Sequence, residues 1–186
     1  MKLLYLDVET TGLSHYKNDI IQLAFIIEID GIVKEEKSFN MQPLSMENVE
    51  DSALKVNNIT REQLLTFSYS KDIHNEVFNI FNKYINKYDK ADKFTPCGYN
   101  VRFDLDFFHS WAKKCGNTYS GSYINWKYLD VMQLAYLLDY QGILNLPDYK
   151  LHTICEHFKI EFKEHDALED IKATKQLFKL LLKYIH

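Results

Sequence analysis

Hydrophobic and polar positions along the 186-residue chain predict strands first and helices later. Residues 3–9 and 20–29 are two largely apolar runs of the length and composition of buried strands. Asp30-Gly31 then separates the second run from residues 32–39, and this dipeptide is typical of a tight hairpin turn. The chain is therefore expected to open with three antiparallel strands.

The remainder of the chain alternates short strands with amphipathic helices. Apolar residues recur at helical spacing from Lys71 to Tyr88, which predicts the clearest of the helices. A hairpin followed by alternating strands and helices indicates an α/β fold built on a mixed sheet. The length suits one domain spanning residues 1–186. Further strands are expected at residues 94–99 and 125–129. Further helices are expected at residues 52–56, 104–115, 147–158 and 166–184. One more helix should begin at the capping box of residues 60–63, and another should run from the last strand to about residue 139.

Composition and charge narrow the classes of function. The net charge of −4 argues against a protein that binds a long duplex through many phosphate contacts. It does not exclude binding of only a few nucleotides. The aromatic share of 15% is high, and biased nucleotide composition explains it better than a base-stacking surface. Three widely spaced cysteines form no disulfide or zinc pattern, and no apolar run is long enough for a signal peptide or a membrane span, so a cytoplasmic protein without a membrane partner is expected.

Two acids stand at the end of the first predicted strand. Asp7 and Glu9 are two positions apart, so both side chains point to the same side of the sheet. Two carboxylates this close must share either a proton or a cation. The small-residue turn that follows, residues 10–13, offers backbone N–H groups that could receive a phosphate or a sugar.

Two further stretches carry candidate chemistry. Asp104 opens a predicted helix, where an acid ordinarily serves only the positive end of the helix dipole. His165 precedes Asp170 by five positions, just before the last helix, and Asp170 lies beside that helix's apolar face. Asp166, in the first turn, has the ordinary explanation of a helix cap.

In this order, the stretches LDVETTGL (6–13), NVRFD (100–104) and HDALED (165–170) resemble the three motifs of the DEDDh, or DnaQ-like, 3′-to-5′ exonuclease family. The resemblance covers residues 4 to about 181. It implies a ribonuclease H-like fold, with a mixed five-stranded sheet whose first three strands are antiparallel and with helices on both faces. The sequence differs from the family's pattern at two places where relatives shape the nucleotide pocket. Tyr99-Asn100 replaces a common His-Asn. Residues 56–60 read Val-Asn-Asn-Ile-Thr in place of Val-His-Gly-Ile-Thr.

The same resemblance implies a metal-dependent exonuclease. Asp7, Glu9, Asp104 and Asp170 would hold two Mg²⁺ or Mn²⁺ ions, and His165 would act as the general base. The product would be nucleoside 5′-monophosphates, released from single-stranded 3′ ends and most readily from DNA. Residues expected to hold the terminal nucleotide are Thr10, Thr11, Gly12, Leu13, Asn100 and Phe103.

Several alternatives remain open from the sequence. An RNA exonuclease of the same family would carry the same acids, and Leu13 and Phe103 could equally be core residues. A non-catalytic module that binds nucleic acid or a polymerase is a second alternative, and an α/β domain with accidental acids a third. Because little chain follows the last predicted helix, a freestanding enzyme is expected, with a polymerase partner left open.

Overall fold

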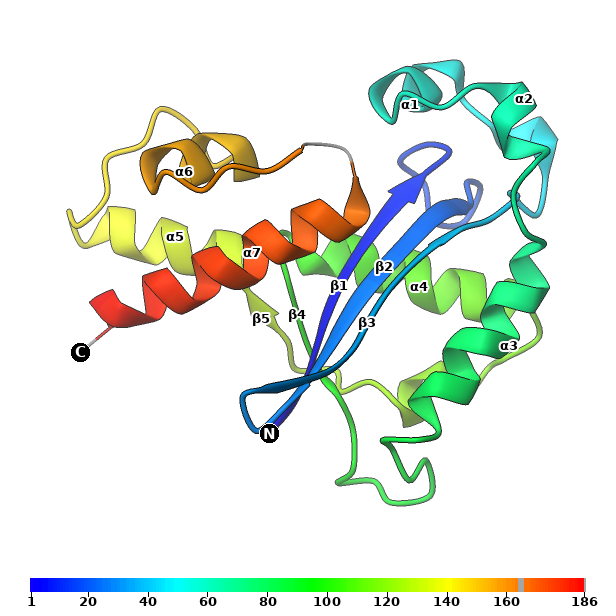
Figure 1. Ribbon diagram of the computed structural model, residues 1–186, viewed down its shortest axis with the longest axis horizontal. Helices are drawn as coiled ribbons and strands as arrows, with labels where there is room; N and C mark the ends of the chain where they lie inside the picture. The colour runs from blue at the N-terminus through cyan, green and yellow to red at the C-terminus, as the bar shows by residue number, and fades with distance from the viewer. Residues whose placement is uncertain (164–165, 186) are drawn as a thin grey trace.

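The computed structural model describes residues 1–163 and 166–185, and its centre is a five-stranded mixed sheet (Figure 1). The strand order is β3-β2-β1-β4-β5. Neighbouring strands pair antiparallel from β3 to β1 and parallel from β1 to β5, as predicted. The strands are β1 (Lys2–Thr10), β2 (Ile20–Ile29), β3 (Ile32–Asn40), β4 (Thr95–Gly98) and β5 (Leu129–Asp130).

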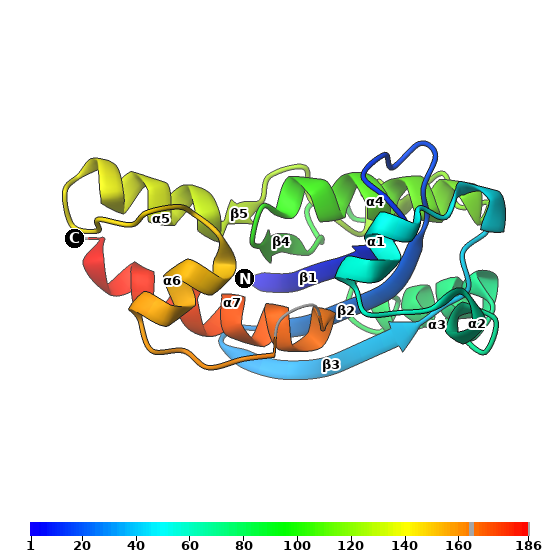
Figure 2. The same ribbon diagram turned by 90° about the horizontal axis from the view of Figure 1, so that it is seen from above.

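Helices cover both faces of this sheet. One apolar core joins β1 and β2 to α3 and α4, and a second joins the opposite face of the same strands to α5, α6 and α7. In Figure 1, α7 crosses in front of the sheet and α4 lies behind it, while Figure 2 shows α1 beside the end of β1. The α-helices are α1 (Asp51–Val56), α2 (Arg61–Leu64), α3 (Ser70–Phe81), α4 (Val101–Lys114), α5 (Val131–Tyr140), α6 (Leu151–His157) and α7 (Ala167–Leu181).

Alternation along β1 decides which face each side chain meets. Leu4, Leu6 and Val8 pack into the core beneath α3 and α4, whereas Tyr5 packs into the core beneath α7. Asp7 and Glu9 share the parity of Tyr5. Both acids therefore point toward the α7 side of the sheet.

The first hairpin and the capping box form as predicted. Asp30 and Gly31 both have positive φ, 50° and 81°, which is the backbone of a type I′ hairpin turn. The Thr60 side chain accepts from the Gln63 N–H, and the Gln63 side chain accepts in return at the start of α2. Among the described residues, no helix has both the length and the apolar composition needed to cross a bilayer.

The predicted extent of α3 was wrong at its end. The helix stops at Phe81 instead of Tyr88. The N–H groups of Lys83 and Tyr84 donate to carbonyls only three residues earlier, in a tighter turn that ends the helix. Tyr84 then anchors the turn to the strands, since its hydroxyl donates to Glu35 and its carbonyl accepts from the Lys2 ammonium.

Three other boundaries also differ from the prediction. Helix α4 begins at Val101, before Asp104, because Asn100 adopts the left-handed conformation (φ 57°) and turns the chain into the helix. Strand β5 contains only residues 129–130, and residues 125–128 form a loop. Helix α6 begins at Leu151, because the Asp148 carboxylate accepts from the Lys150 N–H and the Thr153 hydroxyl ahead of it.

Candidate active site

Three carboxylates from two distant parts of the chain meet at the end of β1. Asp7 and Glu9 come from the strand, and Asp170 comes from the first turn of α7. One carboxylate oxygen from each lies within 4.8 Å of the other two, and all three side chains are partly buried. The fold thus brings the first and third sequence motifs together.

Asp104 approaches the same strand from the opposite helical layer. Strand β4 pairs with β1 only as far as Tyr5, so β1 continues beyond its neighbour. The Val8 N–H on this free stretch donates to Asp104 Oδ1 at 3.0 Å. Asp104 is 4% exposed, so α4 and the edge of β1 that extends beyond β4 together hold a buried carboxylate near Asp7.

The acids raise one another's pKa. Burial raises the pKa of Asp7 well above its ordinary value, and the charges of Asp104, Asp170 and Glu9 add to the effect. Burial, followed by the charges of Asp170 and Asp166, raises the pKa of Glu9 to about 7. Burial also raises the pKa of Asp104. The cluster is therefore costly to ionise unless a positive charge joins it.

The donor set fits a hard divalent cation. Every group in the cluster is a carboxylate oxygen, which suits Mg²⁺ or Mn²⁺ and offers no soft ligand for zinc or copper. The mutual approach of the three oxygens is also of the scale at which one cation can contact them all. The expectation of a divalent metal site is consistent with this chemistry, and Mg²⁺ and Mn²⁺ fit equally well.

Helix α7 begins under two restraints. The Asp166 carboxylate accepts from the N–H groups of Leu168 and Glu169, which is the capping role expected of it. Gln22 Oε1 accepts from the Ala167 N–H at 2.9 Å, a contact that links β2 to the third motif. Gln22 was not among the residues predicted from the sequence. His165 lies outside the described residues, so its role as general base stays a prediction.

The turn after β1 is held by its own polar groups. The Thr11 hydroxyl accepts from the Asp19 N–H, and the Thr10 hydroxyl donates to the Gly12 carbonyl. Both threonines are buried. A Cβ on Gly12 would lie 2.4 Å from the Asn18 amide, so only glycine fits. The contacts of these side chains shape the turn, and their predicted contact with a nucleotide stays a prediction.

The other predicted substrate residues differ in exposure. Leu13 is 84% exposed, so it is not a core residue. Phe103 is partly buried against the core, with its ring 4.8 Å from that of Phe107. Asn100 is exposed at the start of α4, where its N–H donates to Asp130.

Both departures from the family pattern have structural roles. The Tyr99 hydroxyl donates to the Tyr149 carbonyl and thereby links the end of β4 to the segment before α6. Asn57 donates to the Thr10 carbonyl at 3.0 Å, so α1 supports the end of β1. Asn58 adopts the left-handed conformation (φ 54°), which asparagine tolerates better than most residues. Asn57 is a second contact that the sequence analysis missed.

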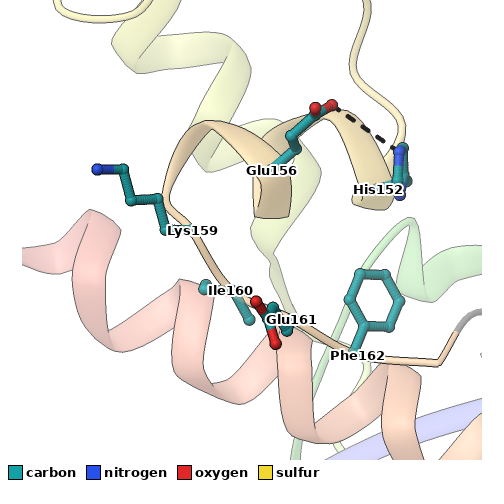
Figure 3. Close-up of a pocket in the computed structure, with 6 residues that line it drawn as sticks. All are labelled: His152, Glu156, Lys159, Ile160, Glu161 and Phe162. Carbon is teal, nitrogen blue, oxygen red and sulfur yellow. Dashed lines mark ion pairs between the residues drawn. The ribbon is translucent and has the colours of Figure 1, made fainter.

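A separate cavity of about 490 Å³ lies between α6 and the chain that follows it (Figure 3). His152 and Glu156 form an ion pair across 3.8 Å on its α6 side, and Phe162 closes the opposite side. None of the clustered acids lines this cavity. The catalytic candidates therefore remain at the end of β1.

A family model described as an exonuclease, of the RNase T type, matches residues 4–178. The chain belongs to this exonuclease family. The resemblance read from the three motifs is thus confirmed, and so is the predicted enzyme class. The mixed five-stranded sheet, with its first three strands antiparallel, also agrees with the predicted fold.

Relatives of this exonuclease domain include much larger proteins. The PolC-type DNA polymerase III of Caldanaerobacter subterraneus is 30% identical over 176 residues, which are 92% of this chain and 11% of the polymerase. A ribonuclease T from Wigglesworthia glossinidia brevipalpis is 26% identical, over 93% of this chain and 80% of that enzyme. The chain therefore spans about a tenth of the PolC-type relatives but most of the ribonuclease T.

Solved structures show the same fold. Escherichia coli exonuclease I in complex with a dT13 oligonucleotide superimposes with a TM-score of 0.78 at 22% identity, over 99% of this chain and 43% of that one. Its product-bound form gives a TM-score of 0.76, also at 22% identity, over 99% of this chain and 45% of that one.

Proposed function

We propose that this exonuclease domain removes nucleoside 5′-monophosphates from single-stranded DNA 3′ ends with the help of two divalent cations. The observation that carries the proposal is the approach of Asp7, Glu9 and Asp170 to within 4.8 Å, with Asp104 held beside them. Carboxylates held this close repel one another when they are ionised, and a cation bound between them accounts for their proximity.

Each group has a role in this proposal. Asp7, Glu9 and Asp170 would hold one Mg²⁺ or Mn²⁺, and Asp104 would support the second beside Asp7. When bound, such a pair of cations supplies a stronger water nucleophile and stabilises the charge on the leaving oxygen. His165, which precedes α7, is proposed to accept the proton of the attacking water, a task suited to an imidazole near neutral pH.

DNA is proposed as substrate because PolC-type DNA polymerases are among the relatives, and the dT13 complex of exonuclease I shows DNA bound to the same fold. The ribonuclease T relative favours RNA as a second candidate, because this chain spans 80% of that enzyme's length. A polymerase partner is a further proposal that rests on the PolC relatives alone. An end-labelled panel of matched DNA and RNA oligonucleotides separates the two substrates.

Replacement of Asp7 by asparagine tests the site. Asp7→Asn preserves side-chain size but removes the charge that would hold a cation, so we expect hydrolysis of a labelled single-stranded oligonucleotide in Mg²⁺ or Mn²⁺ to fall at least about 100-fold. Asp72→Asn is the matched control, because Asp72 is an exposed acid in the first turn of α3. Wild-type activity in the Asp7 variant would refute the assigned site.

A further inference from the structure

A groove runs beside the candidate active site, between the β1–β2 loop and the later turns of α4. Its volume is about 540 Å³, and we call it the α4 groove. His15 and Tyr16 form the loop side, and Asp106, Ser110, Lys113 and Lys114 belong to the helix side. Residues on the helix side recur at spacings of three and four, so they lie along one face of α4.

The α4 groove and the acid cluster are both formed on α4, with Asp104 in its first turn and the groove along its later turns. Asp104 and Phe103 stand in the first turn of α4, and the Phe103 ring lies 4.8 Å from that of Phe107. The Phe107 ring in turn lies 6.2 Å from that of His15. The exposed Leu13 belongs to the same β1–β2 loop that forms the other wall. A strand whose last nucleotide reaches the acids can therefore pass along this groove.

Contacts between the two walls hold the groove open in a defined shape. The Ser110 hydroxyl donates to the His15 carbonyl at 2.5 Å. The Lys114 ammonium donates to the Asn18 carbonyl at 2.7 Å and to the Asp19 carboxylate at 2.8 Å. The loop is thus fixed to α4 at its middle and at its end, and the groove does not depend on a ligand for its form.

The chemistry of the groove suits single-stranded nucleic acid. Tyr16 is 83% exposed and offers an aromatic face. Lys113 is exposed and forms no ion pair within the part of the chain that the structure describes. Asp106 is already paired with Arg102 at 3.0 Å, so its charge is offset. An aromatic platform beside an unpaired cation is the usual combination for a base and its phosphate.

We propose that the α4 groove binds the nucleotides that lie 5′ of the terminal one. At about 1.5 Å per residue, α4 extends about 14 Å from Asp104 to Lys113. A stacked strand advances about 3.4 Å per nucleotide, so the groove accommodates about four nucleotides. Substrates longer than a dinucleotide should therefore bind better. This inference rests on the proposed function for its direction along the strand.

The test compares a groove variant with a matched surface variant. Tyr16→Ala with Lys113→Glu removes the aromatic face and reverses the unpaired charge. Tyr88→Ala with Lys90→Glu is the control, because both residues are exposed in the loop after α3, at the other end of the sheet. Hydrolysis of (dT)12 and of the dinucleotide dTpT is measured as kcat/KM, and binding of labelled (dT)12 is measured by anisotropy in EDTA, where no hydrolysis occurs.

We expect the groove variant to lose about 10-fold in both kcat/KM and affinity for (dT)12, while its kcat/KM for dTpT stays within about twofold of wild type. The control variant should match wild type in every assay. Equal losses on both substrates, or no loss on (dT)12, would overturn the proposal. If the wild-type protein hydrolyses neither substrate, the proposed function fails, and the anisotropy comparison alone then decides whether the groove binds the strand.

Discussion

Gln22 shows how one side chain can control the geometry of the acid cluster. Its carbonyl oxygen accepts the Ala167 N–H at 2.9 Å, and its amide nitrogen donates to Asn40 at 3.1 Å. Ala167 is the first residue of α7, and Asp170 follows within the same turn. Gln22 is therefore a positioning residue that holds the start of α7 against β2.

Gln22→Leu should loosen that start. The Ala167 N–H would lose its acceptor in a partly buried place, which costs about 1–2 kcal/mol of unfolding free energy. We expect weaker Mn²⁺ binding by calorimetry and a several-fold loss of activity that excess Mn²⁺ partly restores. Asn40→Ala is the control, because it removes the neighbouring contact but leaves the Ala167 acceptor in place. A Gln22→Leu protein with unchanged Mn²⁺ affinity would contradict the positioning role.

The sequence identified the acids but not the side chains that hold the backbone around them. Asp7 and Glu9 could be placed on one side of a strand from alternation alone, because parity is a local property. Gln22 and Asn57 could not be found in this way, because glutamine and asparagine are common polar residues. The backbone group that each one contacts is far away in sequence and is brought near only by the complete fold.

At the scale of elements, the fit of α4 onto β4 depends on Gly98. A Cβ at this position would lie 2.8 Å from the Val101 side chain and 3.0 Å from the Leu6 carbonyl. Val101 is the first residue of α4, and Asp104 is held by β1 three residues later. The absence of a side chain thus lets α4 begin close enough for its acid to reach Val8.

Gly98→Ala should move the start of α4 away from β1. We expect the free energy of unfolding, measured in urea, to fall by about 1–3 kcal/mol, and nuclease activity to fall with it because Asp104 is displaced. Gly121→Ala is the matched control, since nothing lies within 4 Å of a Cβ there and its φ is not positive. If the two variants proved equally stable and active, the close packing of α4 would not matter.

The order of elements could be predicted more fully than their ends. Strand β2 and the hairpin turn match the predicted boundaries because an apolar run and an Asp-Gly pair are local signals. The end of α3 does not, because apolar spacing continues to Tyr88 while contacts of Tyr84 with β1 and β3 turn the chain earlier. Long-range anchors of this kind leave no periodic signature in the sequence.

For the whole molecule, the two helical layers meet at one point of the sheet. Asp104 comes from the layer behind β1, Asp170 from the layer in front of it, and Asp7 and Glu9 from the strand between them. No single segment contains the site, so it exists only when both layers are packed. Repulsion between the ionised acids therefore lowers the stability of the folded protein, and a bound cation would relieve it.

Because of this repulsion, the acids should make the metal-free protein less stable as the pH rises. Because burial and neighbouring charges raise the pKa of Asp7 and raise that of Glu9 to about 7, the folded protein binds more protons than the unfolded chain at mildly acidic pH. Stability from these groups is therefore present below about pH 4 and is lost as the pH rises through about 7.

In EDTA, Asp7→Asn should consequently be more stable than wild type by about 1–3 kcal/mol at pH 8, with little advantage at pH 4.5, as measured by urea unfolding at each pH. Addition of Mg²⁺ should reverse the order at pH 8, because binding stabilises only the folded wild-type protein, by about 2.7 kcal/mol at 100 times Kd. Asp72→Asn should follow wild type throughout. An Asp7→Asn advantage that does not change with pH would show that packing, and not charge, explains the difference, and the acid cluster would then carry no stored repulsion for a cation to relieve.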